Sequence, residues 1–282
     1  VYGDLIKQAM RKLVNQMEAD IALDVKNNAR TVCGGATNAK PFASASTDLL
    51  ATARNQLVDA GCPDKDGQIA AVMNTGTSHA LRVNSALFNA DSAGSTDVRE
   101  QGILINVHGI NLRESGQISA HTAGTMTGHD PDGALAAGDT SFAFAGSDSG
   151  TLLNGDVIQF GGAGQKYVVA TGSTSGAATG TILLNGTGII DAVTAGAEIT
   201  MAGDYTPTTV FHRNAVELAM RAPALPSVGD AAVDSIIVTD PFSGLVFEIR
   251  MYAGYRKTMI EVAAVWGVKT WKSDFVTTIL GN

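Results

Sequence analysis

The chain has 282 residues, a formal net charge of −8 and a low charged fraction of 16%. This length suits one large domain or two smaller ones and buries a core easily, and the acidic balance excludes the basic footprint of a nucleic-acid-binding protein. No run of about 18 apolar residues predicts a transmembrane helix, and we expect no signal peptide. Because the sequence begins at Val1 rather than at Met, we expect that a part upstream was removed or is not included.

A long helix is predicted from Leu5 to Arg30, a stretch that contains neither proline nor glycine. Its apolar residues recur at steps of three and four and form one stripe, which consists of Ile6, Met10, Leu13, Met17, Ile21 and Val25. Gly34 and Gly35 are expected to stop it. About 26 residues give roughly 40 Å of helix, which is long for a globular domain.

Mixed helices and strands are predicted for the next part of the chain. A polar, flexible stretch runs from Thr31 to Ser46. In chain order we then expect a helix that starts at Thr47 and Asp48 and ends at Gly61, a buried strand at 68–74, a helix at 77–89, a loop at 90–96, and strands at 102–109 and 110–118. Cys33 and Cys62 form no CxxC pair and have no histidine at metal spacing, so they are interpreted as free thiols of a reducing compartment rather than a disulfide.

Four charged residues bracket the predicted strand pair with both signs of charge: Arg99, Glu100, Arg113 and Glu114. This pattern suits intersubunit pairing and plain solubility equally well.

The composition changes in residues 119–208, which hold 17 of the 32 glycines. Eight acidic residues and one basic residue give this segment a charge of −7, so the rest of the chain carries −8 minus −7, or −1. Short β runs at 141–145, 156–160, 166–170, 181–184 and 198–201 alternate with glycine-containing turns. We therefore predict an inserted small antiparallel barrel or sandwich.

Strands dominate the last part of the sequence. β-rich runs are expected at 234–240, 245–253 and 258–268, although the last of these is ambiguous between helix and strand. An amphipathic stretch with Trp271, Phe275 and Ile279 closes the chain. The predicted domains are 1–118, 119–208 and 209–282.

No motif for catalysis, cofactor binding or metal binding stands out. The run GGAGQK at 161–166 lacks phosphate-loop spacing, and GSDSG at 146–150 and GSTSG at 172–176 do not place a serine at the centre of a nucleophile elbow. His121, His129, Asp130 and Asp132 are close in sequence, but an acidic turn is preferred to a metal site because the later calcium-loop ligands are missing. We predict that the protein is not an enzyme and needs no cofactor.

The order of the parts is the most informative feature: a long helix, mixed segments, a glycine-rich acidic insertion and closing strands. Together with the runs FHRNAVELA (211–219), GDVIQFGG (155–162) and WGV (266–268), this order resembles the major capsid proteins of tailed phages with the Hong Kong 97-type fold. More narrowly, it is similar to the P-twenty-two-like branch, whose coat proteins carry an inserted β-barrel. The resemblance implies an α+β fold with a spine helix and with peripheral and axial domains.

The resemblance also implies a function. It predicts a coat protein that assembles in the host cytoplasm into hexamers and pentamers of an icosahedral virion capsid, without a membrane. Scaffold, portal and decoration proteins are implied partners, and the packaged double-stranded DNA is enclosed without sequence-specific binding. Subunit-interface candidates are Lys7, Arg11, Asp20 and Asp24 on the free helix faces, with Arg99, Glu100, Arg113 and Glu114. In this family an N-terminal arm and an extended loop precede the spine helix. Because this sequence begins almost at the helix, we expect that they were cut off, lie on a separate chain or are not included.

Two rival classes stay open. The Gly/Ser/Thr-rich β segment is also compatible with a glycan-binding or decoration and adhesion module of a virion. A hydrolase would need a nucleophile and a base close together near His108 or His212.

Overall fold

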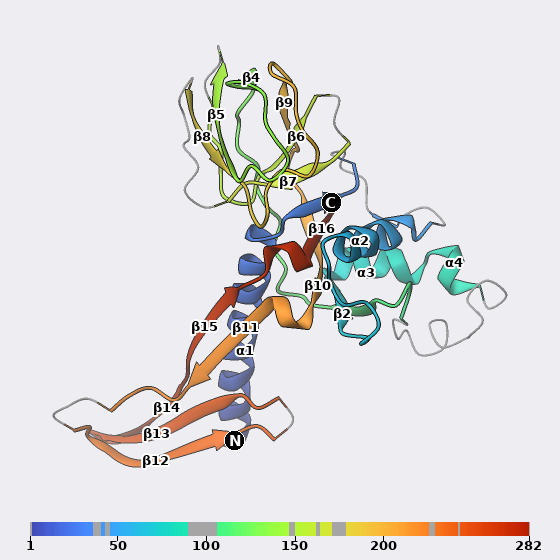
Figure 1. Ribbon diagram of the computed structural model, residues 1–282. Helices are drawn as coiled ribbons and strands as arrows, with labels where there is room; N and C mark the ends of the chain where they lie inside the picture. The colour runs from blue at the N-terminus through green and yellow to red at the C-terminus, as the bar shows by residue number, and fades with distance from the viewer. Residues whose placement is uncertain are drawn as a thin grey trace. The chain divides into compact units, whose positions relative to one another are not determined.

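The computed structural model (Figure 1) describes residues 2–35, 41–42, 46–89, 106–146, 150–161, 164–170, 179–225, 229–241 and 243–281. The chain divides into two compact units. Unit 1 consists of residues 1–21 and 217–269, and unit 2 consists of residues 22–216 and 270–282. No helix among the described residues is long and apolar enough to cross a lipid bilayer.

The predicted opening helix is confirmed as one continuous helix, α1 (Tyr2–Asn27), of 26 residues. Met17 and Val25 of the apolar stripe are buried, and the rest of the stripe is half-buried. The helix ends three residues before the predicted Arg30. Near this end, the side-chain amide of Asn28 donates to the carbonyl oxygen and to the side chain of Asp24.

The prediction of a flexible polar stretch after the helix is wrong at its start. Thr31–Cys33 form strand β1, and all three residues are buried. β1 pairs in parallel with β16 (Val276–Gly281) and antiparallel with β7 (Lys166–Val168). The hydroxyl groups of Thr31 and Thr277 lie 2.8 Å apart, so these polar side chains satisfy each other inside the sheet.

Unit 2 is organised by one sheet with the order β3-β2-β10-β16-β1-β7-β6-β9-β4-β5-β8. The strands of its first part, besides β1 and β16, are β2 (Ile69–Met73), β3 (Asn111–Glu114) and β10 (Thr206–His212). The helix α2 (Asp48–Asp59) covers this part, where Leu50 and Leu57 join a buried cluster with Ile69, Val210 and Ile279. The predicted helix start at Thr47 and Asp48 and the predicted strand at 68–74 are confirmed.

The helix predicted at 77–89 is instead two short helices, α3 (Thr75–Arg82) and α4 (Ser85–Phe88). The interruption contains the buried Asn84, whose amide donates to the carbonyl oxygen of Phe42 at 3.2 Å. The Asn74 side chain caps the start of α3 by accepting from the Thr77 amide at 2.8 Å.

A tight turn separates the two predicted strands around residue 109. His108 and Gly109 both have positive φ angles, and Val107 and Ile110 exchange two backbone hydrogen bonds across the turn. The second strand is shorter than predicted and is β3. Most of the predicted strand at 102–109, and most of the loop at 90–96, lie outside the described residues.

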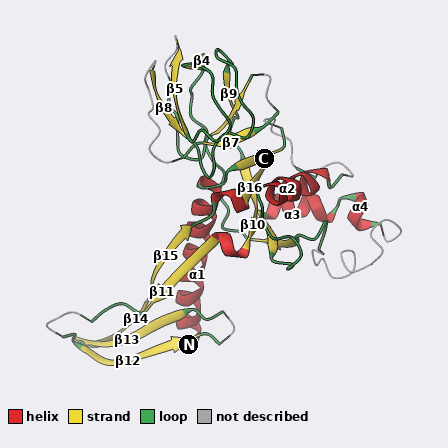
Figure 2. Cartoon of the chain, viewed as in Figure 1, coloured by secondary structure: helices red, strands yellow, loops and turns green. Residues whose placement is uncertain are grey.

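In the described part of 119–208 only strands, turns and loops occur (Figure 2). Besides β7, the strands are β4 (His129–Pro131), β5 (Ser141–Gly146), β6 (Val157–Phe160), β8 (Thr179–Leu183) and β9 (Ile199–Met201). An isolated bridge joins Val169, directly after β7, to Leu184, directly after β8. The strand at the β8 end of this order is therefore also linked to β7, which lies earlier in the order. A separate buried cluster fills this segment, with Phe144, Phe160 and Tyr167 among its large side chains. All five predicted β runs coincide with strands, and β4 was missed.

Unit 1 contains two small sheets besides the N-terminal part of α1. The pair β11 (Val216–Arg221) and β15 (Val265–Thr270) forms one of them. The other is an antiparallel sheet in the order β12-β13-β14, made of β12 (Ala232–Thr239), β13 (Val246–Gly254) and β14 (Lys257–Ala263). The ambiguous run at 258–268 is therefore strand throughout its two segments. Two 3-10 helices, Arg213–Ala215 and Ser273–Phe275, precede β11 and β16.

Candidate functional site

The three-stranded sheet of unit 1 exposes large apolar side chains on both of its faces. Ile236 is 58% exposed and Ile237 is 60% exposed, although both belong to the middle of β12. Neighbouring residues of a strand point to opposite faces, so neither face of β12 is covered by the described residues. Met251 and Met259 are exposed as well.

Part of one face contacts α1. A shallow groove of about 230 Å³ lies between Leu5, Ile6 and Ala9 of α1 and alternate residues of β14, namely Thr258, Ile260 and Val262. Because these strand residues are two apart, they share one face. Leu5 stays more than half exposed, so the helix leaves apolar surface open here.

An ionic cluster around the buried residues Glu248 and Arg250 fixes the middle strand of this sheet. The Arg250 guanidinium donates to Glu248 at 2.7 Å and also to Asp230, and the Tyr252 hydroxyl donates to Asp230 at 2.9 Å. Hydrogen bonds from Tyr252 and then from Arg250 hold the pKa of Asp230 below its ordinary value. Glu248, Arg250 and Tyr252 alternate along β13, so one face of the strand is held by charge-assisted hydrogen bonds.

Of the predicted helix residues, Lys7 and Arg11 are exposed, whereas the two aspartates have partners within the chain. Asp20 accepts a hydrogen bond from the Trp266 indole at 2.9 Å. Asp24 accepts from the amide and the hydroxyl of Thr270, both at 2.7 Å. Neither contact tests a role between subunits, so that role stays a prediction.

The second charged group is only partly described. Arg113 is exposed on β3, while Arg99 and Glu100 lie outside the described residues. Glu114 accepts from Ser78 at 2.8 Å and from Arg82 at 2.6 Å. Burial raises the pKa of Glu114, but these two hydrogen bonds outweigh it, so the pKa lies below its ordinary value.

Sequence reasoning missed a buried chain of ionisable groups in unit 2. Lys26 Nζ lies 2.8 Å from His121 Nδ1, and His121 Nε2 lies 2.8 Å from a carboxylate oxygen of Asp156. Lys26 is 6% exposed and Asp156 is 0% exposed. Burial lowers the pKa of Lys26 to about 8, although the charge of Asp156 opposes this shift. Lys26 and His121 are 95 positions apart in the sequence, and His121 and Asp156 are 35 positions apart. No local sequence pattern could therefore have predicted that they lie together.

Asp156 also organises the turn before β6. It accepts from the Leu153 amide at 2.6 Å and from the Gly124 amide at 3.1 Å. The Tyr205 ring packs against His121 with centroids 5.1 Å apart, and its hydroxyl donates to the Gly155 carbonyl. The arrangement therefore fastens the end of α1 to the glycine-rich segment.

The other histidines that the sequence singles out, His212 and His129, form hydrogen bonds within the fold. His212 is buried and bonded to Asp66 at 2.8 Å, as expected for a satisfied core histidine. His129 Nδ1 bonds the Thr127 carbonyl oxygen at 2.6 Å. Among the described residues no group of histidine, cysteine, aspartate and glutamate has metal-site geometry. Parts of the runs at 146–150 and 161–166, and the whole run at 172–176, lie outside the described residues.

The two cysteines are free, as predicted, and the structure shows that both are buried. Burial raises the pKa of the Cys33 thiol to about 12. Burial, together with the nearby aspartates 66 and 64, raises the pKa of Cys62 to about 11.

Comparisons with known proteins give likeness only at the level of structure. No protein-family model and no curated protein matches the sequence. The chain is similar to a chain of Mycobacterium phage Che8, with 14% identity and a TM-score of 0.48, covering 98% of this chain and 61% of that one. It is also similar to a chain in the capsid structure of the cyanophage P-SCSP1u, with 15% identity and a TM-score of 0.44, covering 100% of this chain and 66% of that one.

The chain thus spans less than two thirds of the length of either phage chain. At these sequence identities and TM-scores, the similarity concerns the backbone fold and assigns no function.

Proposed function

We propose that the chain is the major capsid protein of a tailed phage, which self-assembles into hexamers and pentamers of an icosahedral head around double-stranded DNA. In this proposal α1 is the spine helix of a Hong Kong 97-like fold of the P-twenty-two-like branch. Residues 119–208 are the inserted β-barrel, and residues 1–118 and 209–282 together form the peripheral and axial domains.

The observation that carries the proposal is the exposed apolar surface on strand β12 of the sheet β12-β13-β14. Apolar surface contributes roughly 25 cal/mol per Å² when it is removed from water, and a contiguous exposed patch marks an interaction surface. A small sheet that leaves Ile236 and Ile237 open on opposite faces is incomplete as a monomer. A shell meets this need because each subunit covers its neighbours, and many weak contacts sum across the assembly.

Charge supports the same proposal. Lys7 and Arg11 are exposed on α1 and are suited to contacts at the rim of an apolar interface, where charges set orientation more than affinity. Interface roles for Asp20, Asp24, Arg99, Glu100, Arg113 and Glu114 belong to the proposal in the same way. The net charge of −8 suits a container that encloses DNA without trapping it through counterion release. Scaffold, portal and decoration proteins are its proposed partners.

The experiment is assembly of the purified full chain, followed by sedimentation and negative-stain microscopy. Closed shells or regular hexamers and pentamers are expected. The variant Ile237→Glu places a charge in the apolar surface and should abolish assembly. Its matched control is Ser235→Glu, which adds the same charge on the same face of β12, two residues away, without removing an apolar side chain. A monodisperse small oligomer from the unchanged chain, or equal assembly of Ile237→Glu, would contradict the proposal.

A further inference from the structure

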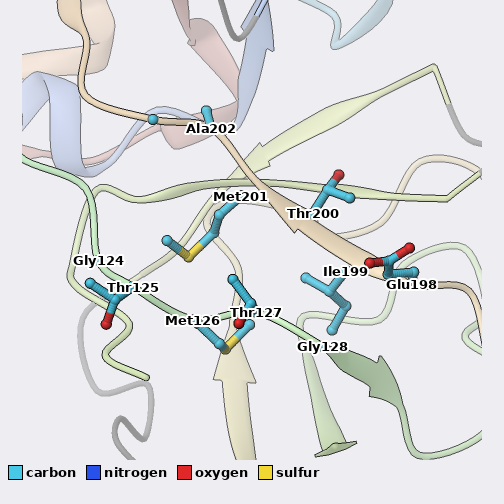
Figure 3. Close-up of a pocket in the computed structure, with 11 residues that line it drawn as sticks. Gly124, Thr125, Met126, Thr127, Gly128, Glu198, Ile199, Thr200, Met201 and Ala202 are labelled. Carbon is cyan, nitrogen blue, oxygen red and sulfur yellow. The ribbon is translucent and has the colours of Figure 1, made fainter. Parts of the chain in front are cut away.

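A groove opens within residues 119–208 where β4 and β9 separate (Figure 3). The two strands pair only at His129 and Ile199. Beyond this point the segment 124–128 forms one wall and residues 198–203 form the other, around a volume of about 340 Å³. Between 124–128 and 200–203, all of which the structure describes, no backbone hydrogen bond is formed.

The wall formed by β9 has an open strand edge. β9 pairs with β6 over its full length, and the Glu198 carbonyl and the Ala202 amide both bond toward β6. Backbone groups of successive strand residues point alternately to the two sides. The amide and carbonyl of Met201 therefore point away from β6, toward the groove. Such an edge is a template for an added strand.

The opposite wall is held in place independently of β9. The amides of Thr125 and Met126 both donate to the carbonyl oxygen of Thr151, at 2.9 and 3.2 Å. Gly124 is fixed by the carboxylate of Asp156. The two walls are therefore anchored to different neighbours. Each wall is held in place without contacts to the other wall, so the groove between them stays open.

The side chains that line the groove differ in polarity along it. Met126 and Ile199 are buried and Met201 is half-buried, so they form an apolar floor. Glu198 is exposed at one end. The whole segment 119–208 carries −7, and this charge would repel the same segment of a second copy.

We propose that this groove binds an extended, basic segment of a different protein by strand addition. Its backbone would pair with the open edge at Met201, its alternate apolar side chains would lie over Met126 and Met201, and its basic side chains would face Glu198 and the acidic surroundings. The proposal goes beyond self-assembly and does not depend on it, because every residue involved lies within one segment of one chain.

The test uses the full chain and a fluorescent heptapeptide that alternates lysine and valine. Saturable binding measured by fluorescence anisotropy is expected. A peptide with glutamate in place of lysine should bind at least about tenfold more weakly. The same loss is expected for a peptide whose backbone amides are N-methylated, since it keeps its side chains but cannot form the ladder.

Protein variants test the edge itself. Met201→Pro removes the Met201 amide, which points toward the groove, and leaves the bonds of β9 to β6, so we expect about tenfold weaker binding. Met201→Leu keeps the amide and should bind like the unchanged chain. Circular dichroism checks that the proline variant folds. If this variant does not fold, binding of the N-methylated peptide to the unchanged chain tests whether backbone pairing is needed.

Three results would overturn the proposal. Equal binding of the N-methylated peptide would show attraction to surface charge alone. Unchanged binding by a folded Met201→Pro variant would exclude the edge. Absence of peptide binding, together with a change in oligomer size in Met201→Pro, would assign the groove to a second copy of the chain.

Discussion

Replacing Asp156 by alanine should loosen the attachment between the end of α1 and the glycine-rich segment. The substitution removes the partner of His121 Nε2, at 2.8 Å, and of the Leu153 and Gly124 amides. It also leaves the Lys26 ammonium group buried without its counter-charge. Breaking a buried pair from one side costs about 3–5 kcal/mol. The local opening equilibrium should therefore rise by roughly a hundredfold to several thousandfold.

Hydrogen exchange followed by mass spectrometry on the full chain measures this effect. Peptides that cover 119–126 should lose protection in Asp156→Ala, whereas a peptide that covers β12 in unit 1 serves as the internal control. The double variant Lys26→Met/Asp156→Ala no longer strands a charge and should recover about 1–3 kcal/mol of the loss. If the double variant loses as much protection as the single one, or if 119–126 is unaffected, the stranded charge is not the reason.

Two further predictions concern the same segment. The pKa of Lys26 is lowered from 10.5 to about 8 in the folded chain, so the unfolded chain binds more protons between these two pH values. The free energy of unfolding, relative to that of Lys26→Met, should therefore rise as the pH increases from 8 to 10.5. If the difference between the urea midpoints of the two proteins stayed constant across this range, the prediction would be contradicted. A Cβ at Gly124 would lie 2.1 Å from the Thr151 carbonyl oxygen, so Gly124→Ala should destabilise by about 1–3 kcal/mol. Gly116→Ala, where no atom lies within 4 Å, should leave thermal unfolding unchanged, and equal melting temperatures for both variants would refute the steric argument.

Local patterns predicted those elements whose formation depends on neighbouring residues. The absence of proline and glycine together with the apolar stripe was enough to predict α1. The strands of 119–208 were predicted because glycine turns delimit each of them. Both signals act over a few residues, so they are visible in the sequence before any long-range contact is known.

The elements that were missed depend on distant partners. β1 has only three residues, too few for a period, and it is a strand because β16 and β7 pair with it. β4 contains Asp130 and Pro131, which read as a turn, yet pairing with β5 makes it a strand. The two short helices replace one because Asn84 bonds to a residue 42 positions earlier.

The candidate site shows the same limit. Asp20 and Asp24 were placed on a solvated helix face because their neighbours in sequence are polar. Their hydrogen-bond partners, Trp266 and Thr270, are 246 positions away in each case. The exposure of Ile236 and Ile237 was equally hidden, since an apolar run predicts a buried strand and only the structure shows that nothing described here covers it.

The pairing of β1 with β16 also governs when the protein can finish folding. Thr31 pairs with Thr277, so β1 has no parallel partner until residues 276–281 have left the ribosome. At 5–20 residues per second, synthesis of the intervening stretch takes roughly 12 to 50 s. Completion of this sheet therefore waits until residues 276–281 have been synthesised, long after β1 itself.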